Sequence, residues 1–328
     1  MKNNFQISEI LDRFQNLYPK KIDLKLERTL NLCKKLGSPH LNLPPTIHIS
    51  GTNGKGSVAA FLRAIAEEEE LKVHSYTSPH LCNFNERIRI SGKLISNQQL
   101  KDTLLEVEKV NAENPITFFE ITTALSFLVF SRHPADLLIL ETGLGGIFDS
   151  TNIIENHLCS VITPISFDHE HFLGNDLSTI AKQKAGIMRP NSTTIWAEQH
   201  PIVEQTLSKN ARKLNCKTIK SKKDFFWESN SDGSFKINLN NVKLSAPKPN
   251  LIGDHQYENA TLAMVALIES GLIKNKQKSI NGISRTNWHG RIQNLSKGQL
   301  AKISKNNDIW LDGAHNLHGA KALINTLI

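Results

Sequence analysis

Residues 47–57 read Ile-His-Ile-Ser-Gly-Thr-Asn-Gly-Lys-Gly-Ser, and this stretch decides the fold. A short apolar run typical of a β-strand leads into three glycines, a lysine and a serine, and an amphipathic helical pattern follows over 58–69. Glycines let the backbone turn tightly, so that successive N–H groups point at phosphate oxygens. The N-terminus of the following helix adds a partial positive charge. We therefore expect a nucleotide triphosphate here, with Lys55 on the outer phosphates and the Ser57 hydroxyl on Mg²⁺.

This phosphate loop departs from the general G-x-x-x-x-G-K-[ST] pattern. Ile49 occupies the position five before Gly54, and Gly56 stands between Lys55 and Ser57. Taken alone, the stretch also fits a glycine-rich turn between a strand and a helix that holds no ligand. The other motifs of the chain decide between these two interpretations.

Length and composition indicate a globular protein with more than one domain. The chain has 328 residues, of which 39% are hydrophobic and 21% are charged. No apolar run reaches the roughly 18 residues that a membrane-spanning helix needs. The N-terminal residues lack the apolar segment of a secretory signal, so we expect a cytoplasmic protein with no membrane partner.

The charge balance and the cysteines bear on three further classes: nucleic-acid-binding, zinc-containing and disulfide-stabilised proteins. Lysine and arginine number 39 against 31 acidic residues, a net charge of +8, but the basic residues are dispersed and only 6% of residues are aromatic. This pattern argues against nucleic-acid binding and fits an anionic small substrate. The cysteines at 33, 82, 159 and 216 form no C-x-x-C pair, which argues against a structural zinc site or a disulfide scaffold.

Strand patterns alternate with helical patterns along the chain. Strands are predicted over 45–50, 72–76, 87–91, 135–141, 158–165 and 307–312, and helices over 7–19, 23–36, 97–113, 117–132, 176–188, 201–214, 254–270 and 316–327. Residues 222–246 carry turn signals and predict a small antiparallel β-rich region. The alternation predicts an α/β fold with a P-loop-containing, doubly wound and mainly parallel sheet.

Polar groups follow three of the predicted parallel strands. They are the phosphate loop, Glu141 before a Gly-Leu-Gly-Gly turn, and the pair Asp168 and His169. Because the carboxyl ends of parallel strands meet at one edge of a sheet, we expect the three groups to converge. Carboxylate and hydroxyl oxygens suit Mg²⁺, which keeps water and phosphate in its coordination shell. Adjacent residues cannot easily point at one ion, so the run 168–171 is not expected to bind zinc.

With these residues placed, the chain resembles the dihydrofolate synthase/folylpolyglutamate synthase family of Mur-ligase-like, ATP-dependent amide ligases. Ten blocks carry the resemblance in order: G-T-N-G-K-G-S at 51–57, T-S-P-H-L at 77–81, N-E-R-I at 85–88, E-x-G-L-G-G at 141–146, D-S-T-N at 149–152, D-H at 168–169, K-A-G-I at 184–187, G-x-H-Q-x-x-N at 253–259, W-x-G-R at 288–291 and D-G-A-H-N at 312–316. Each block alone is weak, but the ordered series is specific.

The sequence departs from the family pattern in two ways. His289 and Leu317 stand where the family usually has proline, which affects loop rigidity more than chemistry. The family also carries a full C-terminal α/β domain after D-G-A-H-N, of which this chain has the first strand and helix. We therefore expect an ATP-binding, Mur-ligase-like domain over 1–295 and an incomplete beginning of a Rossmann-like domain over 296–328, with its apolar positions partly exposed.

The resemblance implies a reaction. The family joins L-glutamate to the carboxylate of dihydropteroate or to the terminal glutamate of a reduced folate, in folate biosynthesis. ATP first phosphorylates that carboxylate, and the glutamate amine then attacks the acyl phosphate, releasing ADP and phosphate. The family tends to be monomeric, so a monomer is expected.

The resemblance also implies roles for individual residues. Gly51, Thr52, Asn53, Gly54, Lys55, Gly56 and Ser57 cradle the phosphates, and Asn259, Arg291, Asp312 and His315 contact ATP across a cleft. Ser57, Ser78 and Glu141 hold Mg²⁺, and His169 helps bind a second ion, which gives two sites. Lys184 matches the family lysine that reacts with CO₂ to form a carbamate. Lys55, Lys184 and His169 are the candidate catalytic residues.

Four residues at the start of the helix predicted over 117–132 are candidates for the pterin side of the substrate: Phe118, Phe119, Glu120 and Thr122. Ordinary core and helix-capping roles account for them equally well.

Two other functions stay open. A Mur-type enzyme that adds an amino acid to a cell-wall precursor is one, although the glycine between Lys55 and Ser57 and the T-S-P-H-L loop argue against it. A truncated product that binds ATP or folate without turnover is the other.

Overall fold

An eight-stranded sheet organises the chain in the computed structural model, which describes residues 2–20, 22–303 and 307–327. Its strand order is β4 (Lys93–Leu94), β3 (Ile88–Ile90), β2 (Val73–Tyr76), β5 (Leu137–Glu141), β1 (Thr46–Ser50), β6 (Cys159–Ile162), β7 (Thr193–Trp196) and β8 (Lys217–Lys220). The six strands from β2 to β8 run parallel, whereas β3 and β4 pair antiparallel at one edge. The predicted α/β class with a mainly parallel sheet is confirmed.

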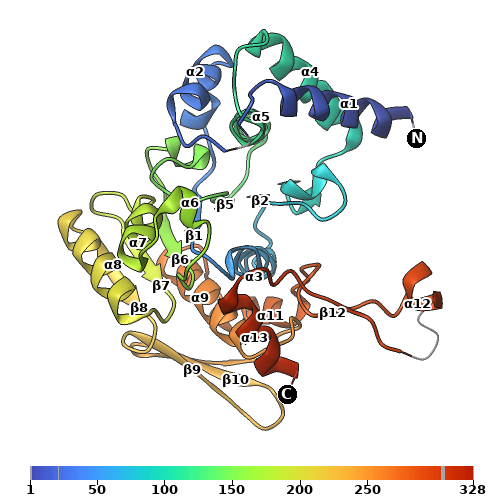
Figure 1. Cartoon of the computed structure of the whole chain (residues 1–328). Coiled ribbons are helices and arrows are strands. Elements are labelled where there is room, and N and C mark those ends of the chain that lie inside the picture. The colour runs from blue at the N-terminus through green and yellow to red at the C-terminus, as the bar shows by residue number, and fades with distance from the viewer. Residues whose placement is uncertain (1, 21, 304–306, 328) are drawn as a thin grey trace.

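Helices cover both faces of this sheet. The α-helices are α1 (Lys2–Asn16), α2 (Glu27–Lys35), α3 (Lys55–Glu67), α4 (Asn97–Asn111), α5 (Phe118–Ser131), α6 (Glu170–Leu173), α7 (Leu177–Ala185), α8 (Pro201–Lys213), α9 (His255–Glu269), α10 (Lys276–Ser279), α11 (Gly282–Arg285), α12 (Gln299–Ile303) and α13 (Leu317–Leu327). Short 3₁₀ turns are η1 (Pro39–Leu41), η2 (Phe84–Arg87) and η3 (Ser150–Ile153). Figure 1 shows α1, α2, α4 and α5 together on one side and α3, α9 and α11 on the other.

The strand residues sort onto these two faces by alternation, as a period of two requires. On β5, Leu137 and Ile139 join the core formed with α3 and α9. Leu138 and Leu140 join the core formed with α1, α2, α4 and α5. A third cluster packs α7 and α8 against β6 and β7. The sheet is therefore buried on both faces, which explains the nearly continuous apolar character of its central strands.

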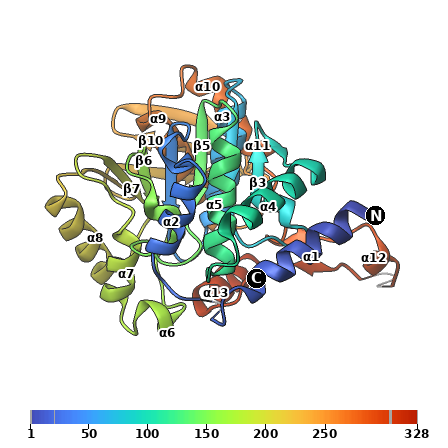
Figure 2. The same cartoon turned by 90° about the horizontal axis from the view of Figure 1, so that it is seen from above.

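Two small sheets lie outside this layer. The predicted antiparallel region is a three-stranded sheet of β9 (Phe225–Ser229), β10 (Phe235–Leu239) and β11 (Val242–Ala246), whose inner residues join the core beneath α9. β12 (Gln293–Asn294) pairs with β13 (Trp310–Leu311). Between them α12 projects from the body of the molecule in Figure 1, and seen from above it lies at the same edge as α1 (Figure 2). The domain boundary at residue 295 stays a prediction.

The sequence patterns misplaced some elements. The first helix was expected over 7–19 but spans Lys2–Asn16, and the second was expected from residue 23 but begins at Glu27. The strands β7 and β8 were not predicted. They read Thr-Thr-Ile-Trp and Lys-Thr-Ile-Lys, which are too short and too polar to give a buried-strand pattern.

A partly buried ion pair joins α2 to the start of α5. Arg28 Nε donates to Glu120 Oε2 at 2.9 Å, and Arg28 also pairs with Asp23 at 2.9 Å. The Glu120 carboxylate accepts from the Thr117 N–H at 2.8 Å, which closes a capping box on α5. The two ends of this network, Asp23 and Glu120, line the cavity of about 650 Å³ that holds the phosphate loop.

An Arg28→Leu change is expected to lower the free energy of unfolding by about 3 kcal/mol, because the Glu120 carboxylate, whose side chain is 3% exposed, then loses its cation. Urea denaturation measures this loss. The matched control is Arg132→Leu, since Arg132 pairs with Glu106 at the surface, where both side chains are at least 40% exposed. That change should cost about 0–1 kcal/mol. Equal losses would contradict the structural role of the Arg28 pair.

Candidate active site

The phosphate loop leaves the carboxyl end of β1 and enters α3 at Lys55. Gly51 has φ +147°, and a Cβ there would lie 1.9 Å from Thr163 Oγ1. Gly54 has φ +93°, and a Cβ there would lie 2.7 Å from Asn259 Oδ1. Both glycines are therefore required, by the backbone conformation and by close approach. The Thr52 N–H donates to Pro164 O at 3.0 Å, which anchors the loop on the segment after β6.

Gly56 has a different constraint. A Cβ at this position would come within 2.9 Å of the Trp288 indole. Gly56, which stands between Lys55 and Ser57 and is absent from the general P-loop pattern, is thus the residue against which Trp288 of the W-x-G-R block packs. Ser57, which follows it, is buried on the first turn of α3.

Two lysines converge on one carbonyl of the loop. Lys55 Nζ donates to Gly51 O at 3.1 Å and to Thr52 O at 3.1 Å. Lys184 Nζ, on α7, donates to the same Gly51 O at 2.7 Å. Lys184 is only 3% exposed. Burial, together with the nearby Lys55 charge, lowers the pKa of Lys184 to about 7.

Glu141 ends β5 beside the loop that contains Ser78. The Glu141 carboxylate is 3% exposed and accepts from the Ser78 N–H at 3.1 Å. Burial raises the pKa of Glu141, and the Lys55 charge acts against that shift. A buried carboxylate with one hydrogen bond is a costly group unless a cation compensates it. Glu141 and Ser78 therefore fit a divalent cation bound next to the phosphates.

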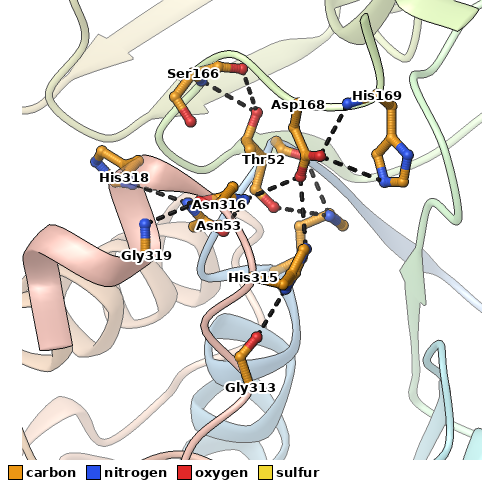
Figure 3. Close-up of polar contacts among 12 residues, drawn as sticks. Thr52, Asn53, Ser166, Asp168, His169, Gly313, His315, Asn316, His318 and Gly319 are labelled. Carbon is orange, nitrogen blue, oxygen red and sulfur yellow. Dashed lines mark hydrogen bonds and ion pairs between the residues drawn. The ribbon is translucent and has the colours of Figure 1, made fainter. Parts of the chain in front are cut away.

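Asp168 and His169 follow β6 and face the C-terminal segment (Figure 3). His169 has φ +51°, and its Nε2 lies 3.8 Å from Asp168 Oδ1. Burial lowers the pKa of His169, whereas the Asp168 charge raises it. The other Asp168 oxygen accepts from Asn316 Nδ2 at 3.0 Å and lies 3.6 Å from His315 Nε2. The imidazole of His169 remains half exposed.

The other residues predicted to contact ATP lie opposite the loop. Asn259 Nδ2 donates to Gln256 Oε1 at 3.0 Å on α9. Arg291 donates to Gly290 O at 3.1 Å. The Asp312 carboxylate accepts from the N–H groups of Ile292 and Ala314, at 2.9 and 2.7 Å, and so shapes its own turn. His315 Nδ1 donates to Gly313 O at 2.7 Å, which leaves Nε2 directed at Asp168.

The residues predicted to bind the nucleotide and the metal line one cavity of about 650 Å³. It contains the whole phosphate loop, and it also contains Ser78, Glu141, His169, Lys184, Asn259, Arg291, Asp312 and His315. The structure thus brings together the polar groups that the sequence places after three separate strands. It adds the D-G-A-H-N segment as the opposite wall.

The structure divides the four residues proposed for the pterin side. Phe119 and Glu120 line the cavity, and the Phe119 ring lies against Gly143, where a Cβ would come within 2.4 Å. Phe118 and Thr122 are not among the lining residues. Thr122 is fully buried, and its hydroxyl donates to Phe118 O at 2.8 Å within the helix. The roles of all four residues toward the substrate stay predictions: Thr122 faces the core, and Phe118 packs against the Phe84 ring.

Sequence reasoning gave no site role to Asp149 or Asn316. Asp149 is buried, lines the cavity and accepts from the Leu144 N–H at 2.8 Å, which shapes the Gly-Leu-Gly-Gly turn. Thr151 Oγ1 also donates to Asp149 and lies 2.9 Å from His48 Nε2 on β1. Both missed residues lie within blocks of the motif series, and that membership was the available signal.

Comparison with known proteins agrees with this geometry. The Mur ligase middle domain matches residues 49–267. The dihydrofolate synthase/folylpolyglutamate synthase of Bacillus subtilis is 33% identical over 319 residues, covering 92% of this chain and 71% of that protein. This chain belongs to the dihydrofolate synthase/folylpolyglutamate synthase family. The dihydrofolate synthase/folylpolyglutamate synthase of Escherichia coli is a further relative, at 31% identity over 95% of this chain and 70% of its own length.

Solved structures of family members share the fold. Mycobacterium tuberculosis folylpolyglutamate synthase, complexed with ADP and AMPPCP, superposes with a TM-score of 0.85 at 31% identity, covering 99% of this chain and 73% of that one. E. coli FolC in complex with DHPP and ADP gives 0.87 at 30% identity, over 97% and 73%. The predicted family and ligase class are confirmed. Among the described residues, no helix combines the length and apolar character needed to cross a bilayer.

Proposed function

We propose that this chain is an ATP-dependent ligase that adds L-glutamate to dihydropteroate, to the glutamate tail of reduced folates, or to both. The observation that carries the proposal is the convergence of the phosphate loop, Glu141, Lys184 and the D-G-A-H-N segment on one cavity. Relatives named dihydrofolate synthase/folylpolyglutamate synthase support the folate substrates over a cell-wall precursor. We also propose that the chain is a monomer in the cytoplasm, which gel filtration and cell fractionation would test.

The chemistry requires activation of a carboxylate. A carboxylate is a poor electrophile, so its oxygen first takes the terminal phosphoryl group of ATP, and ADP departs. The glutamate amine then attacks the acyl carbon, loses a proton, and expels phosphate. Backbone N–H groups of residues 51–57 and the Lys55 ammonium hold the phosphoryl oxygens in place and balance their charge. Arg291 and His315 supply positive or donor groups from the opposite wall.

The oxygen donors in the cavity fit Mg²⁺. Ser57, Ser78 and Glu141 would hold one ion, and His169 would help to hold a second. The ions would supply charge neutralisation on the phosphates. The buried carboxylate of Glu141, whose pKa burial raises, is the observation that supports a cation here.

Lys184 fits a carbamate. An amine with a pKa of about 7 is substantially neutral at physiological pH, and a neutral amine is the form that attacks CO₂. The product, formed with release of a proton, carries one negative charge shared by two oxygens in place of the buried amine beside Lys55. A carbonyl resonance in ¹³C NMR after addition of ¹³C-bicarbonate, absent in Lys184→Met, would support this modification.

Product mass tests the function directly. The chain is incubated with ATP, Mg²⁺, L-glutamate and either dihydropteroate or tetrahydrofolate. A product heavier by one glutamyl unit, reduced at least about 100-fold in Lys55→Ala, would support the ligase. The acceptor that reacts would identify the substrate. Nucleotide binding without product from a folded chain would instead support a binding protein without turnover.

A Glu141→Gln change is expected to raise the Mg²⁺ concentration for half-maximal activity about 10-fold or more, because the amide carries no charge for the ion. Unfolding in urea should be unchanged or harder, since the buried carboxylate is removed. The control Glu108→Gln alters a carboxylate that pairs with Arg13 on the surface. An unchanged Mg²⁺ requirement in Glu141→Gln would exclude this residue as a metal ligand.

A further inference from the structure

Two asparagine side chains, Asn53 and Asn316, meet where the phosphate loop contacts the D-G-A-H-N segment (Figure 3). Asn53 Nδ2 donates to Asn316 Oδ1 at 2.9 Å, and Asn316 Nδ2 donates to Asn53 Oδ1 at 3.1 Å. Each amide thus serves as donor and acceptor to the other. Asn53 belongs to the phosphate loop and Asn316 to the D-G-A-H-N block, 263 positions later in the sequence.

Asn316 makes two further contacts. Its Nδ2 donates to Asp168 Oδ2 at 3.0 Å, and its Oδ1 accepts from the Gly319 N–H at 2.9 Å, in the first turn of α13. One amide therefore joins three parts of the site: the phosphate loop, the segment after β6 and the N-terminus of α13. An amide saturated in this way tolerates few orientations, because each of its atoms must meet a specific partner.

The rest of α13 offers little apolar anchorage to the loop. No described residue of α13 is buried, whereas α3, which carries the loop, is buried along most of its length. Polar contacts from the C-terminal segment reach the loop through Asn316 and through His318, whose Nδ1 lies 2.9 Å from Asn53 Nδ2. The contact of the C-terminal segment with the phosphate loop thus depends on directed hydrogen bonds.

We propose that Asn53 and Asn316 form an interlock that holds the phosphate loop and the D-G-A-H-N segment in register, which makes Asn316 a positioning residue for His315. His315 is adjacent in sequence, and its Nε2 lies near the same Asp168 oxygen that Asn316 contacts. The pairing of Asn53 with Asn316 is inferred from their two hydrogen bonds alone. Only its consequence for catalysis rests on the proposed ligase function.

The design of variants must separate the pair from the helix cap. In Asn316→Ser, the serine side chain can still cap α13 and carries no charge, but it is too short to reach Asn53. Asn53→Ala removes the partner without touching α13 and keeps every backbone N–H of the loop. Asn275→Ser is the matched control, because Asn275 caps α10 through the same kind of side-chain bond, to Lys278 N.

Hydrogen exchange of the full chain tests the interlock without any activity. Asn53→Ala and Asn316→Ser should each speed exchange of the α13 amides about 10- to 30-fold, since each change removes at least two hydrogen bonds. The double variant should exceed Asn316→Ser by less than about 3-fold, because the two residues act as one unit. Asn275→Ser should leave α13 unchanged. The proposal would be overturned if the α13 amides exchanged at the normal rate in Asn53→Ala. It would also be overturned if the increase in the double variant equalled the product of the two single increases.

Kinetics add a readout that a purely structural role would not move. Asn316→Ser should lower kcat about 10- to 100-fold, while the Kd for AMPPCP changes less than about 3-fold, because the phosphate loop is intact. Equal loss of AMPPCP affinity and kcat would overturn the positioning role. If the unmodified chain makes no product, the ligase function fails, and hydrogen exchange still decides whether the interlock exists.

Discussion

A Lys184→Met chain is expected to lose at least about 1,000-fold in ligase rate while remaining folded. Lys184 is buried beside the phosphate loop, and its Nζ contacts the Gly51 carbonyl that Lys55 also contacts. Removing it deletes the group that carries the carbamate in the proposed chemistry. The rate of glutamyl transfer at saturating ATP is the measurement.

The same variant should be more stable than the unmodified chain at low pH. The folded-state pKa of Lys184 is lowered to about 7 from 10.5, so the unfolded chain binds more protons between these values. The free energy of unfolding therefore rises with pH between about 7 and 10.5. Below pH 7 the buried lysine lowers that free energy by roughly 3–5 kcal/mol. The advantage of Lys184→Met in urea denaturation should be largest at pH 6 and should shrink toward pH 10.

Lys182 provides the control on the same helix. It is exposed on α7, so Lys182→Met should change neither the rate nor the pH dependence of unfolding. If Lys184→Met retained the normal rate, the assignment of Lys184 to the reaction would be wrong. If its stability advantage did not vary with pH, the buried lysine would not titrate in this range.

A Gly51→Ala change is expected to abolish nucleotide binding, with a loss of at least about 100-fold in affinity. The added Cβ would lie 1.9 Å from Thr163 Oγ1 and 2.9 Å from Thr163 O, so β6 and the loop would have to separate. The backbone at φ +147° adds strain for any residue with a Cβ. Calorimetry with AMPPCP measures the affinity, and circular dichroism confirms that the chain is folded.

The control separates the clash from the strain. Gly37 also has a positive φ, of +84°, but a Cβ there would meet no atom within 4 Å. Gly37→Ala should cost about 1 kcal/mol of stability and leave AMPPCP affinity unchanged. Comparable losses of affinity in both variants would mean that the contact with Thr163 is unimportant.

Local pattern was sufficient to predict the parts of the site that lie at strand ends. The phosphate loop, Glu141 and His169 each follow an apolar run, and a parallel sheet brings such positions to one edge. The helix phase of α5 was not predictable in the same way. Glu120 and Thr122 differ by two positions and are both buried, and only packing against α2 and the sheet determines that Glu120 lines the cavity and Thr122 does not.

Sequence patterns also could not predict side-chain contacts between residues far apart in the chain. Nothing local to Asn316 indicates that its partner is Asn53, because the register depends on how the chain returns over α3 after β12. The same holds for Arg28, whose partners Asp23 and Glu120 come from a nearby loop and a distant helix. Short polar strands such as β8 are assigned only once their neighbours are in place.

The contact between Gly56 and Trp288 gives the phosphate loop a built-in fluorophore. The indole is partly exposed and rests where a side chain of Gly56 would lie, so a shift of the loop changes the polarity around the ring. The other tryptophans, at 196, 227 and 310, lie on strands elsewhere in the fold. Loop movement can thus be followed optically in the unlabelled chain, and Trp288→Phe identifies the part of the emission that comes from it.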